Sequence, residues 1–196
     1  MTAAVIALGT NLGDREANLR SAIAAIDAID GVSVTGASGI VESYALKPAG
    51  VDESAPNYLN AVALVETSID AETLLDELNL VEAEHGRVRL ERWGDRTLDL
   101  DLIVYGDEQR STARLTLPHP RAWERDFVLV PWLQVDPDAR LPGRGRVDAL
   151  PASVSDALWT FDAAPLVPSD SVARQPAGAR QANPAHKPDP APKAAR

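Results

Sequence analysis

Two acidic side chains interrupt an apolar stretch near the middle of the chain. The stretch TLDLDLIVY begins with an alternation of polar and apolar residues that is typical of a β-strand with one buried face. In such a strand Asp99 and Asp101 lie on one face, roughly 7 Å apart. The opposite face carries Leu98, Leu100 and Leu102. Two like charges at this spacing repel, and a divalent cation removes the conflict: Mg²⁺ is usually held by one or two carboxylates, with water and substrate phosphate oxygens.

Four arginines precede the aspartate pair: Arg87, Arg89, Arg92 and Arg96. They are crowded together in a chain whose formal net charge is -10. The guanidinium fork binds phosphate oxygens in a bidentate manner, and cations beside a carboxylate pair are what polyphosphate transfer requires. The alternative is a solvated strand whose aspartates only form ion pairs with neighbouring arginines. Spacing alone leaves both interpretations open.

Four short motifs occur in a fixed order along the chain. They are GTNLGD at residues 9–14, NYLNAV at 57–62, ERWGDRTLDLD at 91–101 and LPHP at 117–120. Together they resemble the 6-hydroxymethyl-7,8-dihydropterin pyrophosphokinases of folate biosynthesis, and the RWGxRTLDLD block is the specific part of the likeness. The resemblance implies that the protein transfers the β,γ-diphosphate of ATP to the hydroxymethyl group of 6-hydroxymethyl-7,8-dihydropterin and releases AMP.

The resemblance also implies roles for individual positions. Asp99 and Asp101 are expected to share two Mg²⁺ ions that bridge the phosphates of ATP, and one of the two aspartates would also orient or deprotonate the accepting hydroxyl. The expected catalytic residues are Arg87, Arg89, Arg92, Asp99 and Asp101. The expected ATP-binding residues are Arg96, His119, Arg125, Glu82 and Asn79. The expected pterin-binding residues are Tyr58, Asn60, Phe127, Asn11, Ser43, Leu46 and Trp93.

Several of these residues also have purely structural interpretations. Tyr58 and Asn60 lie two residues apart, where a ring and an amide suit a flat heterocycle, but an edge-strand tyrosine beside a satisfied asparagine gives the same pattern. His119 lies between two prolines, which fix its backbone, and a lone histidine is often structural. Asn79 and Glu82 lie off the apolar stripe of their helix, where they could simply be solvated.

The order of expected elements predicts an α+β fold of the ferredoxin-like type. A βαββαβ core would form one antiparallel sheet with its helices on one face. We expect strands at residues 4–8, 32–43, 58–65 and 98–105, helices at 15–27 and 70–85, and a loop at 44–56. A short helix at 121–127 and an amphipathic piece ending near Trp159 would follow as C-terminal additions. Residues 1–165 form one domain in this interpretation, and the Pro/Ala-rich, basic residues 166–196 form a disordered tail.

The composition of the chain limits the cofactors and partners that we expect. The chain has 196 residues, 45% of them hydrophobic, and no cysteine, so disulfides and thiolate-bound zinc are excluded. We expect a cytoplasmic monomer, because we see neither a signal peptide nor a run of membrane-spanning length. Strong acidity argues against nucleic acid as a partner and favours small anionic substrates.

Two other classes of function remain as alternatives. A ferredoxin-like binding module, such as an RNA-binding domain, would carry aromatic residues on the strand that here carries two aspartates. A two-metal nuclease or phosphatase would use the aspartates but would leave the Arg-Trp-Gly segment without an obvious role.

Overall fold

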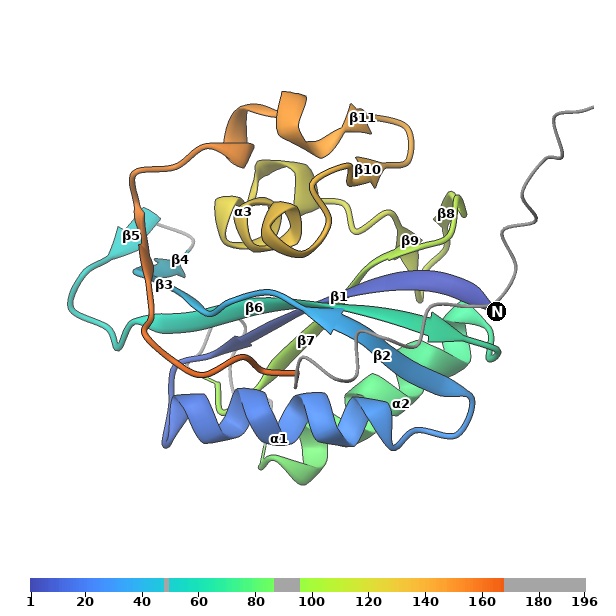
Figure 1. Cartoon of the computed structure of the whole chain (residues 1–196), viewed down its shortest axis with the longest axis horizontal. Coiled ribbons are helices and arrows are strands. Elements are labelled where there is room, and N and C mark those ends of the chain that lie inside the picture. The colour runs from blue at the N-terminus through green and yellow to red at the C-terminus, as the bar shows by residue number, and fades with distance from the viewer. Residues whose placement is uncertain (48–49, 87–95, 168–196) are drawn as a thin grey trace, which may run out of the picture.

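The computed structural model describes residues 1–47, 50–86 and 96–167. One antiparallel sheet forms the middle layer (Figure 1). Helices α1 (Arg15–Asp27) and α2 (Ala71–Glu84) cover one face of the sheet, and α3 (Asp126–Val135) covers the other. The predicted α+β class is therefore confirmed. The expectation that helices lie on one face holds for α1 and α2, whereas α3 belongs to the C-terminal additions and lies opposite.

The sheet contains six strands in the described part of the chain. Their order is β12-β3-β6-β1-β7, with β2 paired to the remaining length of β6. The strands are β1 (Thr2–Thr10), β2 (Val32–Ala37), β3 (Val41–Ser43), β6 (Tyr58–Thr67), β7 (Asp99–Tyr105) and β12 (Leu158–Thr160). All neighbouring strands are antiparallel. The predicted strands that begin near Ala4, Tyr58 and Leu98 are thus confirmed.

Strand β1 is central because its sequence is apolar on both faces. Ile6 and Leu8 belong to the core under α1 and α2, and Val5 and Ala7 belong to the second core under α3. A strand that is covered on both sides reads as a continuous apolar run rather than as an alternation. The segment AVIAL therefore specifies an inner strand.

Side-chain caps fix the starts of the two long helices. Asp14 accepts a hydrogen bond from the Ala17 N–H at 3.1 Å, and Asp70 accepts from the N–H groups of Glu72 and Thr73 at 3.0 and 3.1 Å. Gly86 follows α2 with a φ of 74°, a left-handed conformation that glycine adopts without strain. The two long helices predicted at residues 15–27 and 70–85 are confirmed to within one residue at each end.

The single strand expected at residues 32–43 is wrong, because the segment forms two strands, β2 and β3, that pair with different parts of β6. Between the two strands the Ser38 hydroxyl accepts the Val62 N–H at 2.9 Å, and the Ser38 N–H donates to the Val62 carbonyl at 2.9 Å. The Ser38 side chain thus accepts the Val62 N–H of β6 in place of a backbone carbonyl. The expected loop after Ser43 also contains a small hairpin, β4 (Ala45–Lys47) with β5 (Gly50–Asp52).

The C-terminal expectations are also corrected. In place of a helix at 121–127, a 3-10 turn, η1 (Ala122–Glu124), ends at Arg125, whose extended backbone separates it from α3. In place of an amphipathic piece, the chain forms short strands and 3-10 turns before it reaches β12. These are β10 (Arg140–Leu141), β11 (Gly145–Arg146), η2 (Val147–Ala149) and η3 (Pro151–Ser153).

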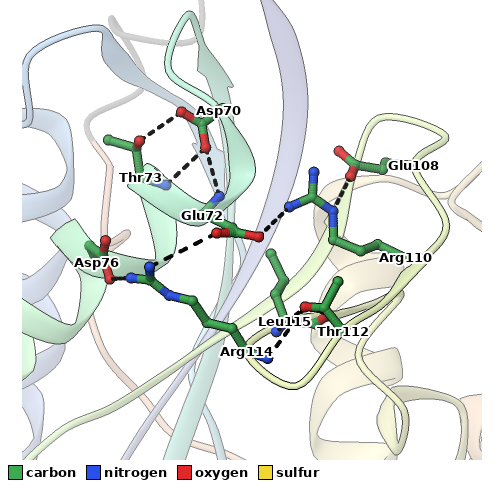
Figure 2. A network of polar contacts seen from close by, with 9 residues as sticks. All are labelled: Asp70, Glu72, Thr73, Asp76, Glu108, Arg110, Thr112, Arg114 and Leu115. Atoms are coloured by element: carbon green, nitrogen blue, oxygen red, sulfur yellow. Dashed lines mark hydrogen bonds and ion pairs between the residues drawn. The ribbon is translucent and has the colours of Figure 1, made fainter.

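A polar network ties the start of α2 to the segment that follows β7 (Figure 2). Arg110 donates to Glu72 at 2.8 Å, and Arg114 pairs with both Glu72 and Asp76. Arg110 begins the short hairpin of β8 (Arg110–Ser111) and β9 (Thr116–Leu117). Each exposed ion pair contributes little alone. Together they hold the hairpin whose last strand leads directly into Pro118 and His119.

The segment after β12 returns across the molecule toward α1. Arg20 of α1 donates hydrogen bonds to the carbonyls of Ala164 and Pro165 at 2.6 and 3.0 Å. Leu166 is buried in the core under α1 and α2, and Val167 packs against that core. Residues 168–196, which contain most of the predicted tail, lie outside the described residues. Among the residues that are described, no helix has the length and apolar character needed to cross a membrane.

Candidate active site

A cavity of about 300 Å³ lies where β1, β6 and β7 end beside the start of α3. Nine of the residues singled out from the sequence line it: Ser43, Leu46, Tyr58, Asn60, Arg96, Asp99, Asp101, Arg125 and Phe127. They come from five separate segments of the chain. The sheet and α3 bring them together, and we therefore treat this cavity as the candidate active site.

The two aspartates project from one face of β7 into this cavity. Leu98, Leu100 and Leu102 are buried in the core on the opposite face, so the predicted alternation is confirmed. Asp99 pairs with Arg96 at 2.6 Å, and Asp101 pairs with Arg125 at 2.7 Å. The ion pairs of the structural alternative are therefore present, but they lie inside a cavity and not on an open strand face.

Gly9 separates the two ends of the cavity. In the register of the sheet it lies opposite Asn60 of β6 on one side and opposite Asp99 of β7 on the other. A Cβ atom placed on Gly9 would come within 3.3 Å of the Asn60 Oδ1 and 3.7 Å of the Tyr58 ring. Because adjacent strands lie about 5 Å apart, the backbones of β6 and β7 lie about 10 Å apart on the two sides of this one residue.

Arg125 is the least exposed cation of the site. Its side chain is 15% exposed, and its guanidinium lies 5.7 Å from the centre of the Phe127 ring. Its Nε–H is buried and has no hydrogen-bond partner among the described residues. A buried donor without a partner is costly, so this edge of the guanidinium suits an anionic ligand oxygen.

His119 lies behind Asp101. Its Nε2 is 3.8 Å from the Asp101 Oδ2, and its Nδ1 accepts a hydrogen bond from the Arg121 N–H at 3.3 Å. Burial lowers the pKa of His119 from its usual value and outweighs the opposing effect of Asp101. A neutral ring with Nδ1 as acceptor carries its hydrogen on Nε2, the nitrogen that faces Asp101.

The other end of the cavity is aromatic and neutral. Tyr58 lies at the start of β6, which is paired on both sides, so the alternative of an edge-strand tyrosine is excluded. Asn60 is buried, and its Nδ2 donates to the Ser43 hydroxyl at 3.0 Å. Phe127 comes from α3 and lines the same cavity. Rings around a fixed amide suit a flat heterocycle with donors and acceptors on its edge.

Four of the described residues that were predicted for the site do not line the cavity: His119, described above, and Asn11, Glu82 and Asn79. Asn11 is buried, and its Oδ1 accepts the Arg96 N–H at 2.8 Å, so it holds the backbone just before β7. Glu82 is also buried and accepts the Leu100 N–H of β7 at 2.7 Å. Asn79 donates to the Leu75 carbonyl one turn earlier in α2, at 2.7 Å. Neither Asn79 nor Glu82 is simply a solvated surface group, and their ligand-binding roles remain predictions.

Four predicted residues cannot be located in the cavity. Arg87, Arg89, Arg92 and Trp93 lie outside the described residues. Conversely, the sequence interpretation assigned no role to Gly9, Tyr44 or Arg121, which all line the cavity. Gly9 carried one signal that could have found it, because a glycine ends an inner apolar strand immediately before a turn. Tyr44 and Arg121 carried no comparable signal.

The donor set fits a magnesium ion that is shared with a substrate. Within the described residues, no group of three or more His, Cys, Asp or Glu side chains could enclose a metal. Asp99 and Asp101 supply two carboxylates side by side on β7, which is the number that Mg²⁺ usually takes from protein when phosphate and water complete its shell. The chemistry of this pair therefore suits a cation that arrives with a polyphosphate.

Fold and site together define a class of protein. Carboxylates for a divalent cation, guanidinium groups for phosphate, and rings around an amide are the components of an enzyme that moves phosphate groups from a nucleotide to a flat acceptor. Comparison with known proteins gives the particular family. The chain belongs to the 7,8-dihydro-6-hydroxymethylpterin-pyrophosphokinase (HPPK) family, whose model matches residues 5–137.

Named relatives support this membership. The 2-amino-4-hydroxy-6-hydroxymethyldihydropteridine pyrophosphokinase of Haemophilus influenzae is 40% identical over 156 residues, which are 80% of this chain and 95% of the relative. The protein of the same name from Synechocystis is 43% identical over 143 residues, covering 73% of this chain and 71% of the relative. The Bacillus subtilis protein of the same name is 42% identical over 132 residues, covering 67% of this chain and 77% of the relative.

Solved structures agree at the level of the fold. An HPPK-DHPS crystal structure in complex with substrates matches with a TM-score of 0.56 at 12% identity, over 78% of this chain. The wild-type HPPK-DHPS of Plasmodium falciparum matches with a TM-score of 0.54 at 13% identity, over 74% of this chain. In both cases this chain spans 43% of the solved chain.

Proposed function

We propose that this protein transfers the diphosphate group of ATP to 6-hydroxymethyl-7,8-dihydropterin, giving the pterin diphosphate and AMP, as a step of folate biosynthesis. Family membership and the names of the relatives support the reaction. The observation that carries it is the two-ended cavity: carboxylates and arginines lie on one side of Gly9, and Tyr58 and Asn60 lie on the other.

Asp99 and Asp101 would hold Mg²⁺, and two ions are proposed. Bound there, Mg²⁺ would offset negative charge on the phosphate oxygens. Arg96 and Arg125, which pair with the aspartates in the structure, would turn part of their hydrogen-bonding capacity toward phosphate. Arg87, Arg89 and Arg92, outside the described residues, are proposed to complete the set of cations.

The chemical step exchanges one bond to phosphorus for another. The hydroxymethyl oxygen of the pterin attacks the β-phosphorus of ATP, and the bond from this phosphorus to the α,β-bridging oxygen breaks. AMP leaves with that oxygen, and an aspartate of the pair accepts the hydroxyl proton. The protein contributes mainly by holding the two substrates in line and by compensating charge.

The neutral end would hold the pterin. Tyr58 and Phe127 offer flat apolar faces, and Asn60, held by its hydrogen bond to Ser43, offers its carbonyl to the ring edge. Leu46 would close the apolar side. We also propose that Trp93 and Asn11 contact the pterin. Trp93 lies outside the described residues, and Asn11 holds the backbone at Arg96.

We also propose that the core has the ferredoxin-like topology. Its strands in chain order are β1, β2, β6 and β7, and their order in the sheet is β7-β1-β6-β2. The helices α1 and α2 follow β1 and β6, as the βαββαβ arrangement requires. The working form is proposed to be a cytoplasmic monomer that acts on small molecules and binds neither nucleic acid nor membrane, in keeping with its acidic, cysteine-free composition.

Chromatography of nucleotide products tests the proposal. The protein is incubated with ATP, Mg²⁺ and 6-hydroxymethyl-7,8-dihydropterin, beside a sample without pterin and a sample with excess EDTA. We expect AMP only when the pterin and Mg²⁺ are both present. Formation of ADP or inorganic phosphate instead would replace the proposal with another phosphoryl-transfer reaction on the same aspartates, and no turnover would favour a binding module.

A further inference from the structure

The C-terminal part of the chain contributes an aromatic residue next to the cavity. Tyr44 lines the cavity directly after β3, and the ring of Trp159, in β12, packs against the Tyr44 ring. The ring centres are 4.8 Å apart and the planes meet at 88°, which is the edge-to-face arrangement that aromatic pairs favour. Trp159 lies beyond residue 137, where the match to the family model ends.

The strand register produces this contact. Trp159 lies opposite Glu42 in the antiparallel pair of β12 and β3, so Tyr44 is its diagonal neighbour, one residue past the end of β3. Diagonal neighbours across antiparallel strands are within reach of large aromatic side chains. Ser43, the residue between Glu42 and Tyr44, is paired with Leu158 on one side and Tyr58 on the other.

The contact is not explained by core packing. Trp159 remains 41% exposed, and it belongs to neither of the two buried clusters of the protein. Its ring meets Tyr44, which lies between Ser43 and Leu46 in a segment that lines the cavity. A large side chain that stays half in solvent and touches the wall of a site acts on that wall more than on the stability of the fold.

We infer that Trp159 is a positioning residue for the neutral end of the site: from the face of the sheet that carries Glu42, it packs on the Tyr44 ring and so holds in place the segment from Ser43 to Leu46, which lines the cavity beside Tyr58. This inference rests on the proposed function for the identity of the ligand. The position of the Tyr44 ring, by contrast, is a property of the free protein.

Steady-state kinetics of the full chain provides the first test. Trp159→Ala should raise the KM for 6-hydroxymethyl-7,8-dihydropterin about threefold to tenfold, the effect of losing one aromatic pair. The KM for ATP should stay within about twofold, since Tyr44 lies at the end of the site away from the aspartates. Trp159→Phe keeps a ring and should restore most of the loss. Val154→Ala, at a residue of the same segment that is 80% exposed, is the matched control.

A double-mutant cycle assigns the effect to Tyr44. In a Tyr44→Ala background, Trp159→Ala should cause no further rise in the pterin KM. A general loss of stability would instead lower the melting temperature, change both KM values and persist in that background. Equal KM values for wild type and Trp159→Ala would overturn the inference.

A ligand-free measurement separates this inference from the proposed function. The chain has three tyrosines, so an NMR spectrum of tyrosine-labelled protein is simple, and Tyr44→Phe assigns the Tyr44 ring signals. Trp159→Ala should shift these signals, because an adjacent indole changes their magnetic environment. Absence of AMP formation by the wild type would refute the reaction alone, whereas unshifted Tyr44 signals would refute the positioning role whatever the reaction is.

Discussion

Each carboxylate of the candidate site has a guanidinium partner when no ligand is present. Asp99 holds Arg96, and Asp101 holds Arg125. This arrangement keeps four charged groups compatible with one cavity, because each is offset by its neighbour. A cation on the aspartates and a polyphosphate on the arginines would exchange these internal pairs for pairs with ligands. The two aspartates and their two arginine partners are thus balanced in charge in the structure.

Removing one carboxylate charge should abolish the reaction without unfolding the protein. For Asp99→Asn and Asp101→Asn we expect AMP formation to fall about 100-fold or more, because charge compensation at the phosphates is lost. Asp107→Asn, at an exposed residue two positions after β7, is the matched control. The check is turnover against Mg²⁺ concentration together with circular dichroism. Near-normal turnover in either variant would remove that aspartate from the metal site.

The shape of the Arg125 side chain should matter as well as its charge. Lysine in its place retains a positive charge but lacks the guanidinium edge whose Nε–H is buried and unpaired. We expect Arg125→Lys to lower kcat/KM for ATP about tenfold or more. Arg140→Lys, the same change at an exposed residue, should have no effect. If both variants keep wild-type kinetics, Arg125 does not bind phosphate.

At the scale of elements, the sequence predicted the strands and helices whose pattern is local. The β7 alternation and the apolar run of β1 specify their elements without help from the rest of the chain. The split of β2 from β3 was missed because the two strands pair with different parts of β6, which is distant in sequence.

The site residues divide in the same way, into those with a local sequence pattern and those placed by strand pairing. The aspartate pair and the Tyr58/Asn60 spacing are local patterns, so sequence alone brought attention to them. Tyr44 reaches the cavity only through the pairing of β3 with β6, and its contact with Trp159 depends on a strand more than one hundred residues later. Such contacts follow from register, and register is not visible in either segment alone.

Glu82 joins helix α2 to strand β7, because its carboxylate accepts a hydrogen bond from the Leu100 N–H. Glu82→Ala should lower the free energy of unfolding by about 1 to 3 kcal/mol, because it leaves a buried donor unpaired. Glu82→Gln keeps an acceptor oxygen and should be milder. Glu84→Ala, at an exposed residue of α2, serves as the control in denaturant titrations. An increased KM for ATP in a stable Glu82→Gln would support the predicted ATP contact, and an unchanged KM would limit Glu82 to holding β7.

The start of α2 should respond to acid. Hydrogen bonds from the Thr73 hydroxyl and N–H hold the pKa of Asp70 below its usual value. A carboxyl with a lowered pKa in the folded state stabilises that state above its unfolded pKa, near 4, and this contribution is lost as pH falls through the lower folded pKa. Wild type should therefore melt at a higher temperature than Asp70→Asn at neutral pH, and the difference should shrink as the pH falls below about 4. A difference that is constant across this range would contradict the assignment.

At the scale of the whole molecule, two layers of helices enclose one sheet, and the chain after α3 returns to the sheet edge at β3 (Figure 1). The cavity lies where the two halves of the fold meet, since β1, β6 and β7 supply its floor and α3 supplies one wall. The C-terminal strand β12, which lies outside the residues 5–137 that the family model matches, pairs with β3, and β3 carries Ser43 of the cavity wall.

Two truncations separate the framework from the remainder. A chain that ends at Val167 keeps every described element, and we expect unchanged AMP formation and melting temperature. A chain that ends at Ala157 loses β12, the Arg20 hydrogen bonds and the buried Leu166, and its free energy of unfolding should fall by about 3 kcal/mol or more. Thermal melting of both proteins is the measurement. A large loss of stability in the chain that ends at Val167 would show that residues 168–196 contribute to the fold.

The central place of β1 has a consequence for how the protein is made. Of the six strands of the sheet, β1 is synthesised first, yet its partners on the two sides end at Thr67 and Tyr105. Until Tyr105 has been synthesised, an apolar strand that belongs in the middle of the sheet lacks at least one of its two neighbours. A nascent chain in this state is prone to wrong pairings and depends on chaperones or rapid elongation. The first strand of the sheet in chain order is thus among the last that can reach its final surroundings.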